Sequence, residues 1–135
     1  MINIGCPSGW KGFENHCYKF FNALLSWWTA RDFCNARNAN LLSINSQRET
    51  AFITENLMKN LTSNLWTGGY KSYSTSSKLW AWQDNATYNF HDWYESEPND
   101  SDNSDSPACV YMAHWYDYKW FDTSCSNIFS FICKI

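Results

Sequence analysis

The sequence lacks an apolar run of about 18 residues, the length that a membrane-spanning helix needs, so we expect no segment to cross a bilayer. It also lacks a basic excess: 10 Lys and Arg are set against 13 Asp and Glu, giving a formal net charge of −3. Nucleic-acid binders carry a basic stripe, which this composition does not supply. Residues 1–10 lack a charged segment followed by an apolar one, so no signal peptide is expected there.

Closely spaced cysteine pairs are absent as well. Zinc and redox motifs place two cysteines two to four residues apart, whereas the nearest pair here, Cys125 and Cys133, has seven residues between its members. The even total of six favours a disulfide framework, for which fifteen pairings are open. Such a framework belongs in an oxidising, extracellular setting. The six cysteines are Cys6, Cys17, Cys34, Cys109, Cys125 and Cys133.

The chain has 135 residues, of which 44% are apolar and 19% aromatic, so residues 1–135 are predicted to form one domain with a sizeable core. Ser26 is the expected N-cap of a first helix in which Cys34 points inward. Ser46 and Glu49 form a capping box at the start of a second helix, where each side chain binds a free backbone N–H. An inner stripe then follows at helical spacing: Phe52, Ile53, Leu57 and Leu61.

Several short segments are typical of strands. Residues 6–22 predict a strand pair pinned by a bridge, and residues 41–44 a buried strand. Residues 65–70 predict a further strand, whose paired glycines Gly68 and Gly69 let another backbone approach closely. The tryptophans at 66, 80, 82 and 120 are assigned to the core. Trp115, Tyr116 and Tyr118 are either structural or rim residues, or they stack on a sugar face.

An acidic stretch dominates the second half. No Lys or Arg occurs between Lys78 and Lys119, and six acids fall within residues 92–105 beside Asn and Ser. Such a stretch is unsuited to a helix or strand but suits a loop. A solvated acidic loop and a calcium site are both open readings, since calcium takes six to eight oxygens from carboxylates, amide carbonyls and water. Pro98 stiffens the turn between Glu97 and Asn99 and favours the calcium site.

These residues resemble the C-type lectin domain in its long form, over nearly the whole chain. The matching pieces are Cys6-Pro7-x2-Trp10-x6-Cys17-Tyr18, Trp28-x-Ala30-x3-Cys34, Leu41-Leu42-Ser43-Ile44, Trp66-Thr67-Gly68-Gly69, Trp80-x-Trp82, Trp93-x3-Glu97-Pro98-Asn99, Cys109, Trp120-Phe121-Asp122-x2-Cys125 and Phe131-Ile132-Cys133. The resemblance implies an α+β fold with two helices flanking small antiparallel sheets, a long irregular ligand-binding loop and three disulfides. It pairs Cys6 with Cys17, Cys34 with Cys133 and Cys109 with Cys125, which bounds a core at residues 6–133.

The family's ligand residues carry over one by one. Glu97 and Asn99 match the Glu-Pro-Asn motif, which in sugar-binding members binds calcium and hydrogen-bonds vicinal hydroxyls. Asp122 matches the aspartate of the Trp-Asn-Asp motif, whereas Phe121 stands where that motif has its asparagine. The acid usually found shortly before the cysteine is also missing, and we expect Asp105, or Asp102, to fold back in its place. The expected sugar ligands are Glu97, Asn99 and Asp122, and the expected metal ligands are these three with Asp105.

The resemblance implies a calcium-dependent carbohydrate-binding domain of mannose, N-acetylglucosamine or fucose type. The three histidines of this chain have no nucleophilic side chain at a spacing typical of catalysis, so we expect a lectin and not an enzyme. The expected partners are glycans on cell or microbial surfaces, with neither nucleic acid nor membrane insertion, and with a homo-oligomer to supply avidity. The protein is expected to be extracellular, either secreted or an ectodomain. The alternative, favoured by Phe121, is a calcium-independent module that recognises a protein or another non-sugar surface.

Overall fold

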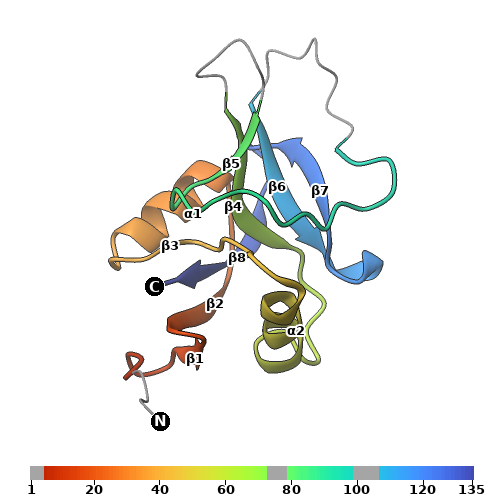
Figure 1. Ribbon diagram of the computed structural model, residues 1–135. Helices are drawn as coiled ribbons and strands as arrows, with labels where there is room; N and C mark the ends of the chain where they lie inside the picture. The colour runs from red at the N-terminus through yellow and green to blue at the C-terminus, as the bar shows by residue number, and fades with distance from the viewer. Residues whose placement is uncertain (1–4, 73–78, 99–106) are drawn as a thin grey trace.

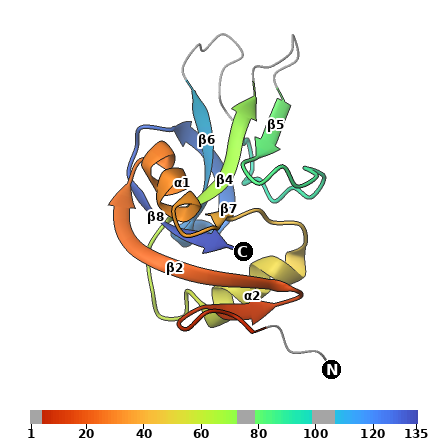
Figure 2. The same ribbon diagram turned by 90° about the vertical axis from the view of Figure 1, so that its left-hand side faces the viewer.

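A computed structural model describes residues 5–72, 79–98 and 107–135 (Figure 1). The elements follow in the order β1 (Lys11–Phe13), β2 (His16–Leu25), α1 (Trp27–Asn35), β3 (Asn40–Leu41), α2 (Gln47–Asn56), β4 (Leu65–Ser72), β5 (Leu79–Trp82), β6 (Ala108–Ala113), the 3-10 helix η1 (His114–Tyr116), β7 (Lys119–Ser124) and β8 (Phe129–Lys134). Figure 2 shows α1 above the long, curved β2 and α2 beneath it. In these stretches no helix is both long and apolar enough to cross a membrane.

The described strands join in one mixed sheet. Its main path runs β1-β2-β8-β4-β6-β7, while β3 also pairs with β8 and β5 with β4. All of these pairings are antiparallel except that of β4 with β8, which is parallel. The predicted α+β architecture with two helices is confirmed, but the separate small antiparallel sheets are replaced by this single one. The reason is that β8 lies between β2 and β4 and joins the two parts of the sheet.

The disulfides have the pairing that the resemblance implies. Cys6 is bonded to Cys17 across the first hairpin, Cys34 of α1 to Cys133 of β8, and Cys109 of β6 to Cys125 after β7. No cysteine is left free. Cys34 and Cys133 are fully buried, so this bond ties the first helix to the middle of the sheet through the core.

Both helix starts follow the prediction. The Ser26 hydroxyl accepts a hydrogen bond from the Thr29 backbone N–H at 3.3 Å, and the Ser46 hydroxyl accepts one from the Glu49 backbone N–H at 3.1 Å. The Glu49 carboxylate reaches the N–H of Asn45 at 2.7 Å, one residue before the expected partner.

The predicted inner stripe is wrong at its end. The second helix stops at Asn56 and Leu57 is its C-cap, so Leu61 lies beyond it and is 38% exposed. Met58 is buried in the core instead. The chain turns after the C-cap, where the N–H groups of Leu57 and Met58 share the Ile53 carbonyl, and helical spacing no longer applies.

Close backbone approach is found at Gly68, whereas Gly69 makes room for a side chain. A Cβ on Gly68 would lie 2.9 Å from the Leu41 carbonyl oxygen, and one on Gly69 would lie 2.9 Å from the Val110 side chain. The Gly68 N–H donates to the Leu42 carbonyl at 2.7 Å.

The strand predicted at residues 41–44 is shorter than expected, because it ends at Leu41, although residues 42–44 are buried.

A buried ion pair joins α2 to β8. The Lys134 ammonium contacts the Glu49 carboxylate at 2.6 Å, and both side chains are at most 5% exposed. The Tyr18 hydroxyl donates to the same carboxylate at 2.6 Å, and Lys134 also donates to the Ser43 carbonyl at 3.0 Å. Burial, followed by the hydrogen bond to Glu49, raises the pKa of Tyr18 well above its ordinary value. The tyrosine therefore stays protonated and serves as a donor.

Candidate functional site

Residues 92–94, at the start of the acidic segment, are held against β7 by backbone hydrogen bonds. The Trp120 N–H donates to the Asp92 carbonyl at 2.9 Å, and the Tyr94 N–H donates to the Trp120 carbonyl at 3.0 Å. The Trp93 ring packs edge-on against the buried Trp120 ring, 5.6 Å between centroids. Residues 92–94 are therefore aligned with the strand that carries Asp122.

A tight turn then brings Glu97 back toward the strand. The Glu97 N–H donates to the Tyr94 carbonyl at 2.9 Å, Ser96 has a positive φ of 70°, and the Glu97–Pro98 peptide bond is cis. The Glu97 carboxylate accepts a long hydrogen bond, 3.4 Å, from the Asp122 N–H. The structure thus brings together two of the four predicted metal ligands. The other two, Asn99 and Asp105, lie outside the described residues.

The Glu97 carboxylate and residue Asp122 lie in contact, and both carry the carboxylate oxygens that calcium prefers as ligands. Both residues act electrostatically on Tyr111 of β6. Burial raises the pKa of Tyr111 most, and the negative charges of Glu97, Tyr116 and Asp122 raise it further. Among residues 5–72, 79–98 and 107–135, no three His, Cys, Asp or Glu side chains converge as a metal cluster. The described part of the site fits calcium but supplies only two of its carboxylates.

Phe121, the departure from the family motif, belongs to an aromatic stack. Its ring lies parallel to Tyr94, 5.0 Å between centroids at 19°, and to Tyr111, 5.6 Å at 24°. Tyr116 packs on it at 5.2 Å. A phenyl ring offers no oxygen ligand, so this position contributes packing between the acidic segment and the sheet.

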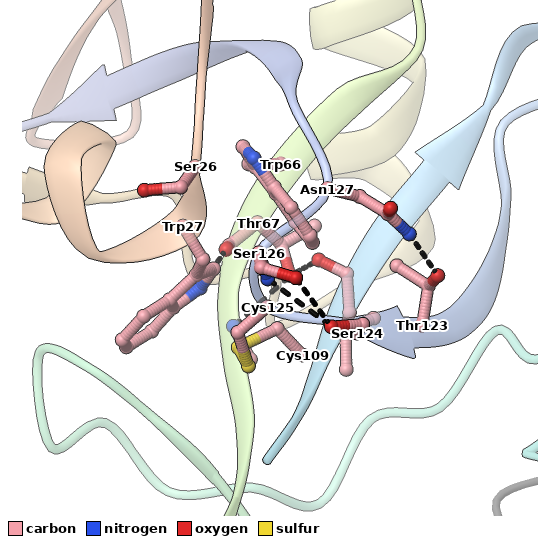
Figure 3. Close-up of a disulfide and its surroundings, with 12 residues drawn as sticks. Ser26, Trp27, Trp66, Thr67, Cys109, Thr123, Ser124, Cys125, Ser126 and Asn127 are labelled. Atoms are coloured by element: carbon pink, nitrogen blue, oxygen red, sulfur yellow. Dashed lines mark hydrogen bonds between the residues drawn. A yellow bond between two sulfur atoms is a disulfide. The ribbon is translucent and has the colours of Figure 1, made fainter. Parts of the chain in front are cut away.

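The Cys109–Cys125 bond braces the strands behind the site (Figure 3). The Trp27 N–H donates to the Cys125 carbonyl at 3.0 Å, and its indole N–H donates to the Thr67 carbonyl at 2.9 Å. The start of α1 is thereby fixed to β4 and to the turn after β7. Figure 3 shows this contact beside the disulfide.

The core assignments of the tryptophans hold in three cases out of four. Trp66, Trp82 and Trp120 are buried, whereas Trp80 is half-buried and packs on Trp93 at 5.1 Å.

The aromatic residues of η1 and of the turn after it differ in exposure. Tyr118 is buried and structural, whereas Trp115 is 77% exposed and Tyr116 is 49% exposed. Trp115 and Tyr116 line a pocket together with residues of the acidic segment. No signal in the sequence locates this pocket, because its walls come from two separate segments.

The C-type lectin domain model, described as "Lectin C-type domain", matches residues 23–135. A "C-type lectin" of Micrurus corallinus is 34% identical over 134 residues, which span 96% of this chain and 82% of the relative. A "C-type lectin mannose-binding isoform" of Oxyuranus scutellatus is also 34% identical, with the same coverage of both chains. The chain therefore belongs to the C-type lectin domain family.

Solved structures agree with this fold. A Ca2+-dependent type II antifreeze protein in its Ca2+-free form is 31% identical, with a TM-score of 0.84 over 96% of this chain and 99% of the other. A calcium-independent type II antifreeze protein superimposes with a TM-score of 0.85 over 99% and 96% of the two chains, and at 24% identity this likeness speaks for the fold alone. The fold is thus shared by one protein described as Ca2+-dependent and another described as calcium-independent.

Proposed function

We propose that the protein is a calcium-dependent carbohydrate-binding lectin whose site is centred on Glu97 and Asp122. The observation that carries the proposal is the contact of the Glu97 carboxylate with the Asp122 backbone, which brings together two predicted ligand residues from different segments. The likeness to a relative named as mannose-binding supports the sugar class. Asn99 and Asp105 complete the proposed metal ligands.

The proposed site is poor in ligands. Without Asp105, the three other side chains, the Asp122 carbonyl and two sugar hydroxyls give about six oxygens, the lower end of what calcium accepts, and Asp105 would raise this to about seven. Phe121 removes the oxygen of the usual asparagine. We therefore propose a calcium Kd of ~10⁻⁴–10⁻³ M, as in extracellular modules.

Sugar choice follows from the groups beside the metal. The Glu97 carboxylate accepts a hydrogen bond from one hydroxyl, and the Asn99 amide donates one to its neighbour. This order of acceptor and donor suits the equatorial 3- and 4-hydroxyls of mannose and N-acetylglucosamine, and the analogous hydroxyl pair of fucose. Since monosaccharides would bind weakly, we propose that several copies engage glycans on a cell or microbial surface together. The three disulfides favour an extracellular setting.

Calcium is expected to stabilise the fold by mass action. At about 10 mM calcium and the proposed Kd, the gain in the free energy of unfolding is about 1.4–2.7 kcal/mol. Differential scanning calorimetry with and without chelator measures the matching rise in Tm. Acidification to about pH 4 should abolish the rise, because carboxylate ligands must be deprotonated to bind metal.

Two variants sharpen this test. Glu97→Gln removes a ligand charge and should lose the calcium-dependent rise in Tm. The control Asp32→Asn changes an exposed side chain of α1 and should keep the calcium-dependent rise in Tm. A Tm that millimolar calcium leaves unmoved in the unmodified protein contradicts the proposal.

The sugar preference is expected to shift on exchanging the donor and the acceptor. The double change Glu97→Gln with Asn99→Asp should weaken mannose binding and relatively improve galactose binding, because galactose has an axial 4-hydroxyl. A glycan array with both proteins, each in calcium, measures the preference. Strong galactose preference in the unmodified protein would refute the assignment.

A second candidate function is calcium-independent recognition of a protein or another non-sugar surface. It is favoured by Phe121, which fills a ligand position with a ring stacked on Tyr94 and Tyr111. The 31% identity to a type II antifreeze protein points to ice as one surface to test. Ice-recrystallisation inhibition that persists in chelator, together with a blank glycan array, would favour this function over the lectin.

A further inference from the structure

A second pocket lies beside the proposed calcium site, between η1 and the acidic segment. It has a volume of about 360 Å³, and we call it the aromatic pocket. Its lining residues are Trp93, Tyr94, Glu95, Trp115, Tyr116, Asp117 and Lys119. None of them is among the proposed calcium ligands. This volume is at the lower end of small-molecule sites, so the pocket suits a compact group.

The aromatic walls are held in place by their neighbours. Tyr94 and Tyr116 meet at 4.8 Å between centroids in a T-shaped pair, and both pack against Phe121. Trp93 is wedged against the buried Trp120. Trp115 is the most exposed of these aromatics at 77%, and Tyr116 is 49% exposed. The pocket is therefore largely preformed, and Trp115 is its most exposed aromatic lining residue.

The charge of the pocket is negative. Glu95 and Asp117 contribute two exposed carboxylates. Of the described lining residues only Lys119 is cationic, and its ammonium lies 2.6 Å from the carboxylate of Asp92, whose side chain is 9% exposed. This ion pair neutralises Lys119, so the two lining carboxylates keep a net charge of −2.

Aromatic faces combined with carboxylates favour an organic cation. A cation within about 6 Å of a tryptophan or tyrosine centroid is attracted by the negative ring face, and this attraction is strongest when the cation is poorly hydrated. Quaternary ammonium groups meet that condition. A neutral sugar could stack on the same rings but would gain nothing from the two carboxylate charges, and an anion would be repelled.

We propose that the aromatic pocket binds a quaternary ammonium group of about the size of choline, independently of calcium. Trp115 and Tyr116 provide ring faces, while Glu95 and Asp117 provide the negative field. Asp117 and Tyr118 have positive φ angles of 56° and 59°, and the Tyr118 N–H donates to the Ala113 carbonyl at 2.9 Å. Asp117 is the C-cap of η1 and lines the pocket from this turn.

The test is a titration with choline, followed through the indole N–H resonances in ¹H–¹⁵N NMR spectra. Its matched control ligand is 3,3-dimethyl-1-butanol, which has the shape of choline without the charge. We expect choline, in chelator, to shift the Trp115 resonance in a saturable manner, and the neutral ligand to bind at least roughly fivefold more weakly. Equal binding of the two ligands would overturn the proposal, as would no saturable shift with choline.

Two variants locate the binding. Asp117→Asn removes a charge while keeping a residue type that accepts positive φ, and Trp115→Ala removes a ring. Each should weaken choline roughly fivefold to tenfold, whereas Asp32→Asn on α1 should not. Unchanged choline binding in both pocket variants would place the ligand elsewhere and overturn the assignment.

Further measurements separate this pocket from the proposed lectin site. The calcium-dependent Tm rise should persist in Asp117→Asn, and choline binding should persist in Glu97→Gln. Loss of choline binding in Glu97→Gln would contradict a separate pocket. Cosedimentation with phosphatidylcholine vesicles identifies a lipid headgroup as the source of the cation, and choline binding without cosedimentation identifies a soluble source.

Discussion

Replacing Cys34 and Cys133 together by alanine is expected to lower the free energy of unfolding by about 4–5 kcal/mol. The bond closes a loop with a sequence separation of 99, and the loss of such a constraint raises the conformational entropy of the unfolded chain. Since small globular proteins are stable by only about 5–15 kcal/mol, this change should leave the fold marginal at physiological temperature. Chemical denaturation followed by tryptophan fluorescence measures the loss.

The first hairpin supplies a matched control. Its bond between Cys6 and Cys17 has a sequence separation of only 11, so the same alanine exchange should cost about 3 kcal/mol or less. Equal losses for the two pairs would contradict the argument from loop length. Full reduction of all three bonds should unfold the protein at physiological temperature.

Glu49→Ala is expected to cost about 3–5 kcal/mol of stability, because it leaves the ammonium of Lys134 buried without its charged partner. The change also strips an acceptor from the Tyr18 hydroxyl and from the Asn45 N–H, which lie 2.6 and 2.7 Å from the carboxylate. Lys134→Met should cost less, since Tyr18 and Asn45 still donate to the carboxylate. Urea denaturation measures both changes.

An exposed ion pair of the same length serves as the control. Arg48 contacts Glu14 at 2.6 Å, but the two side chains are 77% and 47% exposed. Exposed pairs of this kind contribute roughly 0–1 kcal/mol, so Arg48→Ala should barely shift the denaturation midpoint. A loss as large as that of Glu49→Ala would show that burial is not the source of the effect.

Local chemistry explains which parts of the fold could be predicted. The caps at Ser26 and Ser46 depend on residues within one turn, and the structure confirms both. The stripe failed at Leu61, because helical periodicity does not say where a helix ends. The partnership of Glu49 with Lys134 spans 85 residues, and no local pattern reveals it.

The candidate site divides in the same way. The family motifs predicted that Glu97 and Asp122 share a site, and the structure places them in contact across 25 residues. The roles of Asn99 and Asp105 stay predictions. The ion pair of Asp92 with Lys119 could not be predicted, since it depends on how the acidic segment lies along β7. The aromatic pocket could not be predicted for the same reason, because it forms where the acidic segment meets η1.

The central place of β8 has a consequence for biosynthesis. This strand follows all the other described strands in the sequence, yet it lies between β2 and β4 and also pairs with β3. While the ribosome still covers residues 129–134, β2 and β4 have no strand to join them. The nascent polypeptide must therefore wait with unpaired strand edges, and such long-range pairing is slow to form. The sheet therefore cannot close before residues 129–134 have left the ribosome, and chaperones that shield strand edges would act before that point.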